Sequence, residues 1–222
     1  DGVRNRAERV AELEAERARL QGEHEAVCRE LSEARTEAAT RLGAAIGETL
    51  GRLGFLQSTF EVGVSPCEPG ALGADKVEFG FSPNPGEPVQ PLRQIASSGE
   101  IARTMLAIKT VLTDADDIPI LVFDEVDANI GGRVAHAVAE ELAALGQRHQ
   151  TLCISHLAQI AAAAQRHFRV AKTVEDNRTE TRMDPLDAAG RETELTRMLG
   201  GQDDSAAARS HARELLGAGG AQ

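Results

Sequence analysis

The first part of the chain repeats apolar positions at alternating spacings of three and four residues. One set of positions is Val10, Arg17, His24, Leu31, Ala38 and Ala45, and the other is Leu13, Leu20, Val27, Ala34 and Arg41. Five heptads without proline, separated by Glu and Arg, are typical of a coiled coil. Arg17, His24 and Arg41 interrupt the seam, so the partner helix must tolerate polar side chains. The alternative is an ordinary amphipathic helix that packs on a globular core.

The pattern changes to alternation after a group of glycines between residues 43 and 54. "STFEVGVSP" alternates Phe60, Val62 and Val64, and "DKVEFGFSP" repeats the same pattern with Val, Phe and Phe. Both segments predict strands with one buried face. The stretch Pro83–Pro91 holds four of the eight prolines and predicts an ordered loop.

From residue 100 onward, helical and strand patterns follow one another. "IPILVFDE" is a continuous apolar run, which predicts a strand covered on both faces. Such alternation predicts an α/β domain with a largely parallel sheet and flanking helices. The expected helices are 100–113, 132–145 (ending at Gly146), 157–165, 191–199 and 204–216. The other expected strands are "TLCIS", "HFRVAKTV" and "RTETRM", the last two joined by a turn at Asp176–Asn177.

Composition narrows the classes of function. The net charge is -11, the pI is about 5.1, and the chain has no Trp or Tyr. Nucleic-acid contact relies on clustered Lys and Arg, so this charge argues against a nucleic-acid-binding surface spread over the whole chain. A local basic patch, or DNA contact through parts of the protein outside this chain, stays open.

Cysteine usage and apolar runs bear on the compartment. Cys28, Cys67 and Cys153 lie far apart, which argues against a disulfide framework or a zinc site and fits a reducing compartment. The sequence has no run of 18 apolar residues and no signal peptide, so we expect a soluble cytoplasmic protein without a membrane partner. It begins at Asp1 without Met, so we expect a fragment of a longer protein.

A first candidate site is Ser97–Ser98–Gly99–Glu100, at the predicted start of the helix 100–113. Unpaired N–H groups and the positive end of the helix dipole can bind an anion there, such as a terminal phosphate. The alternative is a capping box, with Ser97 as N-cap and Glu100 three residues later. The two interpretations are compatible.

A second candidate site is the acidic pair Asp124–Glu125, which follows the apolar strand. Ligands of α/β sheets bind at the carboxyl ends of the strands. Asp124 is suited to hold Mg²⁺, and Glu125 to orient or deprotonate an attacking water. Packing alone rarely explains paired acids there, because a buried unpaired carboxylate is costly.

His156, directly after "TLCIS", is the third candidate. A histidine at a strand end can donate a hydrogen bond to a phosphate or to the attacking water. A lone histidine is more often structural, so its value depends on whether its strand lies beside "ILVFDE".

The three sites, with spacings of 24 residues from Glu100 to Asp124 and 32 from Asp124 to His156, resemble the C-terminal half of ABC-type ATPases. There these elements are the signature, the Walker B motif and the switch histidine. "PLRQIASSGEIARTMLAIKTVL", "VFDEVDANIGG", "ISHLAQIAAAAQRHFRVAK" and "ELTRMLGG" are similar to the RecN family of bacterial DNA repair proteins, in the SMC-like branch. The resemblance covers roughly residues 55–216, and the preceding coil matches that family's returning arm.

The resemblance implies a coiled-coil arm at residues 1–52 and the C-terminal half of an ATPase head at residues 53–222. It also implies site residues. The γ-phosphate of ATP on the opposite head would be bound by Ser97, Ser98, Gly99 and Glu100. Asp124 would bind Mg²⁺, Glu125 would be the catalytic carboxylate, and His156 would be the switch residue. Asp127 and Asn129 would lie in the loop that crosses between heads. Ser98 departs from the family pattern, which has Gly there, and Ser resists the backbone angles that Gly allows.

No GxxxxGK[ST] phosphate loop occurs in these residues, so the chain alone lacks a cradle for the β- and γ-phosphates. The resemblance implies that the N-terminal half of the same head supplies it, and that two heads form a homodimer around ATP. It further implies DNA as a partner, in double-strand break repair near the nucleoid. A coiled-coil scaffold with a degenerate ATPase half is the alternative function; a transporter subunit is the least favoured.

Overall fold

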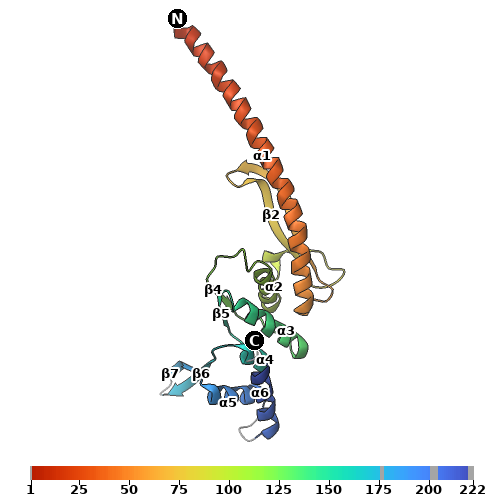
Figure 1. Ribbon diagram of the computed structural model, residues 1–222, viewed down its shortest axis with the longest axis vertical. Helices are drawn as coiled ribbons and strands as arrows, with labels where there is room; N and C mark the ends of the chain where they lie inside the picture. The colour runs from red at the N-terminus through yellow and green to blue at the C-terminus, as the bar shows by residue number, and fades with distance from the viewer. Residues whose placement is uncertain (1, 176–177, 201–204, 220–222) are drawn as a thin grey trace. The chain divides into compact units, whose positions relative to one another are not determined.

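The computed structural model describes residues 2–175, 178–200 and 205–219 (Figure 1). They form two compact units: residues 1–47 with 59–93, and residues 48–58 with 94–222. The arm–head boundary expected after residue 52 stays a prediction, because each unit combines a segment before that boundary with a segment after it. In the described part of the chain, no helix is both long and apolar enough to cross a membrane.

The first unit is built on one long helix, α1 (Gly2–Arg52). Ion pairs at i,i+3 and i,i+4 spacing, such as Arg19 with Glu16 and Glu23, run along its surface. The apolar seam residues Val10, Leu13, Leu20 and Val27 are 53%, 54%, 50% and 62% exposed. An amphipathic helix that packs on a globular core would bury them, so their exposure among the described residues fits the coiled-coil interpretation better than that alternative.

A three-stranded antiparallel sheet belongs to the same unit, in the order β1 (Thr59–Gly70), β2 (Gly73–Ser82) and β3 (Gln90–Pro91). Its register pairs Phe60 with Phe81 and Val62 with Phe79. These pairs lie on one face because cross-strand partners point the same way. The two predicted strands are confirmed. The loop expected at Pro83–Pro91 is confirmed except at its end, where Gln90 pairs with Phe81.

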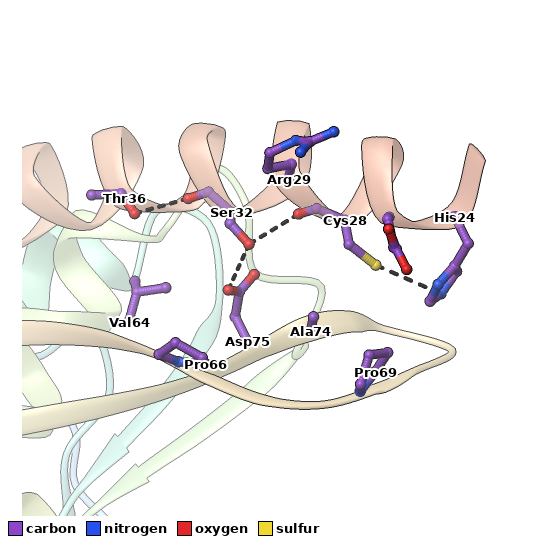
Figure 2. A pocket seen from close by; sticks show the side chains of 11 residues that line it. His24, Cys28, Arg29, Ser32, Thr36, Val64, Pro66, Pro69, Ala74 and Asp75 are labelled. Atoms are coloured by element: carbon purple, nitrogen blue, oxygen red, sulfur yellow. Dashed lines mark hydrogen bonds between the residues drawn. The ribbon is translucent and has the colours of Figure 1, made fainter. Parts of the chain in front are cut away.

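The β1–β2 hairpin is fastened to α1 near its tip (Figure 2). The Ser32 hydroxyl donates to Asp75 Oδ1 over 2.6 Å, and Arg35 Nη1 lies 3.0 Å from Asp75 Oδ2. Arg35 Nη2 also donates to the Leu72 carbonyl over 2.7 Å. Gly73 has φ +96°, and a Cβ there would lie 2.8 Å from Leu31 Cδ2. The turn therefore favours glycine for its backbone angle, whereas the tip of the Leu31 side chain could move aside.

A hollow of about 430 Å³ lies between α1 and the hairpin (Figure 2). In it the thiol of Cys28 lies 3.6 Å from Nε2 of His24. Among the described residues, no group of three or more His, Cys, Asp or Glu side chains is placed to hold a metal ion.

The second unit confirms the α/β fold. Its elements alternate as α2 (Ser98–Val111), β4 (Ile120–Phe123), α3 (Gly132–Leu145), β5 (Gln150–Cys153) and α4 (Ala158–Ala163), after a 3-10 turn at Leu92–Gln94. β4 and β5 are parallel neighbours, with Phe123 opposite Cys153. Helix α3 has the predicted bounds, and on its apolar face Val138, Leu142 and Leu145 are buried whereas Val134 is partly buried. The strand "TLCIS" therefore lies beside "ILVFDE", which is the arrangement on which the candidate role of His156 depends.

One face of the β4–β5 sheet is bare. Leu121 and Phe123 are buried, whereas Ile120, Val122, Leu152 and Ile154 are 52%, 65%, 47% and 61% exposed. The expectation that β4 is covered on both faces is thus wrong within this chain, because its helices cover only the alternate set of side chains. We call these four exposed residues the bare face.

The strand expected at "HFRVAKTV" does not join β4 and β5. It is β6 (Phe168–Glu175), which pairs antiparallel with β7 (Arg178–Pro185). The turn expected at Asp176–Asn177 lies outside the described residues. Of the sheets in the described ranges, only β4–β5 is parallel, so the largely parallel sheet is represented by one strand pair.

Two helices close the described chain, α5 (Ala188–Met198) and α6 (Ala206–Gly219). Both confirm predicted helices, although α5 begins three residues earlier than expected. Asp187 explains this start, because its carboxylate accepts a hydrogen bond from Gly190 N over 2.7 Å as an N-cap. The helices pack with α4 through Ala158, Ala162, Leu195 and Ala212.

Candidate functional site

The candidate site lies at the carboxyl ends of β4 and β5. Because the two strands are parallel, the residues that follow them emerge at the same edge of the sheet. Asp124 directly follows β4, and His156 comes three residues after the end of β5. Ile154 N donates to the Phe123 carbonyl over 2.9 Å, which keeps the two chain segments together beyond the strands.

Asp124 and Glu125 are both exposed at this edge. Asp124 Oδ1 accepts a hydrogen bond from Glu125 N over 2.9 Å. Glu125 has φ 58°, the left-handed region that L-residues other than Gly, Asn and Asp seldom adopt. Such a conformation costs on the order of 1 kcal/mol and persists where the surroundings enforce it, often at functional sites. The pair is therefore a strained, solvent-facing acidic turn rather than a packed strand end.

The segment after Glu125 forms a tight turn. Ala128 N donates to the Glu125 carbonyl over 3.0 Å, and Ile130 N to the Asp127 carbonyl over 3.5 Å. Asn129 also has φ 58° and is exposed. Val126 is fully buried, which anchors the turn in the core.

Asp127 differs from the loop contact expected for it, because it is 3% exposed and bonded within the chain. Its Oδ2 accepts hydrogen bonds from Ser155 Oγ over 2.7 Å and from His156 N over 2.8 Å. The same oxygen lies 2.9 Å from His156 Nδ1. Asp127 therefore joins the turn after β4 to the segment after β5.

The start of α2 is the predicted cap. Ser97 is the N-cap residue, and its hydroxyl accepts from Glu100 N over a long 3.4 Å, which confirms this half of the capping box. Ser98 is exposed, and as a helical residue it adopts no conformation that would require glycine. The N–H groups of Ser98 and Gly99, which come before the capped Glu100 N, have no acceptor within the helix, so they can serve an anion.

Gly99 brings this helix start against the turn after β4. A Cβ on Gly99 would lie 2.8 Å from Ala128 Cβ and 3.4 Å from the Ala128 carbonyl oxygen. Real Cβ atoms do not approach so closely, so glycine at this position allows the contact. The start of α2 therefore lies against the turn that follows Asp124–Glu125, although 29 residues separate Gly99 from Ala128.

Arg103 supports the same contact and was not anticipated from the sequence. Its Nη1 donates to the Ala128 carbonyl over 2.9 Å, and its guanidinium lies 5.0 Å from the centroid of the Phe55 ring. The residue is 8% exposed, and this burial lowers the pKa of its guanidinium. The available signal was a lone arginine in the predicted apolar helix 100–113, which marks a buried polar contact.

The arrangement fits the groups that the resemblance implies. Mg²⁺ is usually held by one or two carboxylates together with waters and phosphates, so the exposed Asp124 is a sufficient protein ligand. A helix N-terminus suits phosphate oxygens, and Glu125 and His156 are exposed at the same edge. Of the predicted residues that carry a side chain, only Asp127 is buried.

Known proteins resemble the chain at two levels, although no protein-family model matches it. It is 44% identical over 205 residues to the DNA repair protein RecN of Deinococcus radiodurans, covering 92% of this chain and 36% of that protein. It is 39% identical over 215 residues to RecN of Streptomyces coelicolor, covering 91% of this chain and 38% of that protein. The chain thus spans about a third of the length of the curated relatives it matches.

Solved structures share the fold. The Smc head domain with a coiled coil and joint from Pyrococcus yayanosii matches 82% of this chain and 35% of its own, at a TM-score of 0.52 and 21% identity. The Smc head domain with an extended coiled coil from Pyrococcus furiosus, bound to the C-terminal domain of ScpA, matches 85% of this chain and 48% of its own, at 0.50 and 22%. At these identities the likeness concerns the fold alone.

Proposed function

This chain belongs to the RecN family of bacterial DNA repair proteins, over the third of their length that it spans, and on that premise we propose that it is the catalytic half of an ATP-hydrolysing head. The observation that carries the proposal is the shared edge of β4 and β5. There the Asp124–Glu125 turn contacts the start of α2 through Gly99 and Ala128, and Asp127 binds His156.

Each residue has a chemical role in this proposal. Asp124 holds Mg²⁺, which supplies positive charge to the phosphates when bound. Glu125 orients or deprotonates the attacking water, for which its exposed carboxylate is suited. His156 binds the terminal phosphate or that water. Ser97, Ser98 and the Gly99 backbone, with Glu100 and Asn129 nearby, bind the γ-phosphate of ATP held by a second copy of the head.

The N-terminal half of the same protein completes the head, supplying the phosphate loop. Support comes from the bare face of the β4–β5 sheet, where four large aliphatic side chains of a buried-type strand pair are each 47% exposed or more. A soluble sheet seldom leaves such a face uncovered. In this proposal the complete head dimerises around ATP, and the cycle holds or bridges DNA in double-strand break repair in the cytoplasm, at the nucleoid.

The catalytic role is tested in the assembled head, this chain together with the segment that carries the phosphate loop. Glu125→Gln keeps the shape but removes the basic carboxylate, so we expect MgATP binding to persist, turnover to fall by about 10²–10⁴, and paired heads to accumulate. ATPase rate, nucleotide titration and light scattering after size exclusion measure these outcomes. Wild-type turnover by the Glu125→Gln head would remove Glu125 from the mechanism.

The bare face has its own test. Val122→Lys places a charge at its centre, where the side chain is 65% exposed, so the chain's own unfolding should change little. Assembly with the N-terminal segment should be lost, because an unpaired charge would be buried there. Leu72→Lys is the matched control, since Leu72 is 82% exposed on the turn between β1 and β2. Equal assembly by both variants would place the completing segment elsewhere.

The alternative function, a coiled-coil scaffold with a degenerate ATPase half, predicts no Mg²⁺-dependent nucleotide binding by the assembled head. The left-handed Glu125 disfavours it, because a scaffold gains nothing from holding a glutamate in a costly conformation. Binding that is absent in the nucleotide titration would favour the scaffold.

A further inference from the structure

We propose that Asp127 is a positioning residue for His156, holding the imidazole in the tautomer that carries its proton on Nδ1 and leaves Nε2 for the ligand. The role in turnover rests on the proposed ATPase function, whereas the tautomer itself does not. Asp127 then acts within its own head, instead of in the loop that crosses between heads.

The main observation is that a single carboxylate oxygen contacts His156 twice. Asp127 Oδ2 accepts from the backbone N–H of His156 over 2.8 Å and lies 2.9 Å from its ring Nδ1. Two contacts from one atom to the backbone and the ring of one residue restrict both the chain direction and the side-chain torsions. The imidazole is thereby oriented although the side chain is 72% exposed.

The carboxylate is itself held in place. Its side chain is only 4% exposed, and Ser155 Oγ donates to the same Oδ2 over 2.7 Å. The Ser155 hydroxyl oxygen in turn accepts from Leu157 N over 3.1 Å. On the other side, Asp127 follows the fully buried Val126 in the turn after β4. A buried, multiply bonded carboxylate cannot swing away from the ring without leaving several donors unpaired.

These contacts decide which nitrogen carries the proton. An ionised carboxylate has only lone pairs to offer, and at 2.9 Å an unprotonated Nδ1 would set its own lone pair against them, so the contact favours the ring form with the proton on Nδ1. In the neutral ring Nε2 is then an acceptor, available to a water hydrogen; in the cation Nε2 is a second donor, available to a phosphate oxygen. In the cation, Asp127 also supplies the negative charge that stabilises the positive imidazole. In hydrolytic triads and metal sites, a carboxylate likewise accepts a hydrogen bond from one ring nitrogen of a histidine while the other nitrogen faces the ligand.

The geometry also disfavours a trans role for Asp127. A residue that reaches another head needs an accessible polar atom, whereas Asp127 is 3% exposed and its Oδ2 is shared among three contacts. Asn129, two residues later, is exposed and fits such a contact better.

The tautomer is tested in the 222-residue chain by ¹⁵N NMR of histidine-labelled protein, with His156→Gln assigning the signals. We expect neutral wild-type His156 to show the Nδ1–H pattern. Asp127→Ala should lose that preference, whereas Asp127→Asn should keep it, because an amide oxygen still accepts. Ser155→Ala, which leaves the Asp127–ring contact in place, is the matched control and should also keep it. A wild-type Nε2–H pattern, or an unchanged pattern in Asp127→Ala, would overturn the proposal.

The effect on turnover is tested in the assembled head. Asp127→Ala should lower kcat by about 10–100-fold, as for other residues that orient a functional histidine, with KM changed less than kcat. Asp127→Asn should recover part of the loss, which a simple loss of folding would not allow. Equal kcat in Asp127→Ala and wild type would refute the positioning role. If the wild-type head hydrolyses no ATP, the proposed function fails while the tautomer result stands.

Discussion

The contact between Gly99 and Ala128 yields a prediction with opposing terms. In Gly99→Ala the new Cβ would lie 2.8 Å from Ala128 Cβ, about 1 Å inside the usual carbon–carbon separation of roughly 3.5–4.0 Å. The conflicting atoms belong to a short side chain and to backbone, which cannot rotate away. Overpacking of this kind costs about 1–3 kcal/mol.

The same substitution also has a favourable effect. Alanine stabilises a helix over glycine by about 0.5–1 kcal/mol, chiefly because glycine loses more backbone freedom on folding. We therefore expect a net loss of about 1–2 kcal/mol in the free energy of unfolding for Gly99→Ala. Gly51→Ala is the matched control, because Gly51 lies in helix α1 within the same compact unit and has no atom within 4 Å of its would-be Cβ. It should gain about 0.5–1 kcal/mol.

Urea unfolding followed by far-ultraviolet circular dichroism measures both variants. The reasoning requires the midpoint of Gly99→Ala to fall below that of wild type, and the midpoint of Gly51→Ala to equal or exceed it, with similar slopes. In the assembled head, Gly99→Ala should also slow turnover, because displacing Ala128 moves the turn that carries Asp127. A Gly99→Ala protein at least as stable as Gly51→Ala would show that the contact relaxes freely and would refute the argument.

Three further predictions concern strain, thiol reactivity and acid. Glu125→Gly should raise the free energy of unfolding by about 1 kcal/mol, because glycine relieves the left-handed backbone strain. It should also abolish turnover, because it removes the carboxylate. A lower free energy of unfolding would contradict the argument that Glu125 is strained. Burial, and to a smaller extent the charges of nearby aspartates, raises the pKa of the Cys153 thiol to about 12. Iodoacetamide should therefore alkylate Cys153 ~100 times more slowly than the exposed Cys67. Peptide mass spectrometry measures the two rates. The hydrogen bond from the Ser32 hydroxyl is the main cause that lowers the pKa of Asp75, and the nearby Arg35 guanidinium adds to it. The ionised Asp75 therefore stabilises the fold above about pH 4, and this stabilisation is lost as the pH falls further. The protection of hairpin amides, measured against their intrinsic exchange rate at each pH, should therefore fall in acid in wild type, and less so in Asp75→Asn.

Local patterns were sufficient for most of the elements. Helix α3 has the predicted bounds because its apolar residues recur at helical spacing and Gly146 ends it, both of which are local signals. The N-cap at Ser97 was predictable for the same reason. The start of α5 was missed because Asp187, three residues before Gly190, was not recognised as a cap.

The faces of β4 could not be predicted in this way. A continuous apolar run indicates burial on both sides, which is correct for a strand inside a complete sheet. Within this chain Val122 remains 65% exposed, because no helix of the described residues covers that face. Under the proposed function, the segment that completes the head would cover this face, which is the environment that the apolar run indicates.

By itself the sequence determined the order of helices and strands, the long polar-seamed helix, and the residue types that could bind a nucleotide, since periodicity, caps and motifs act over a few residues. Only the tertiary structure decided which of these residues meet. Asp127 binds a histidine 29 positions away, and Gly99 contacts Ala128 without a Cβ between them. Those contacts follow from the parallel pairing of β4 with β5 and the packing of α2 on the turn after β4. These contacts join residues that are far apart in the sequence, and a pattern that repeats over a few residues carries no information about them.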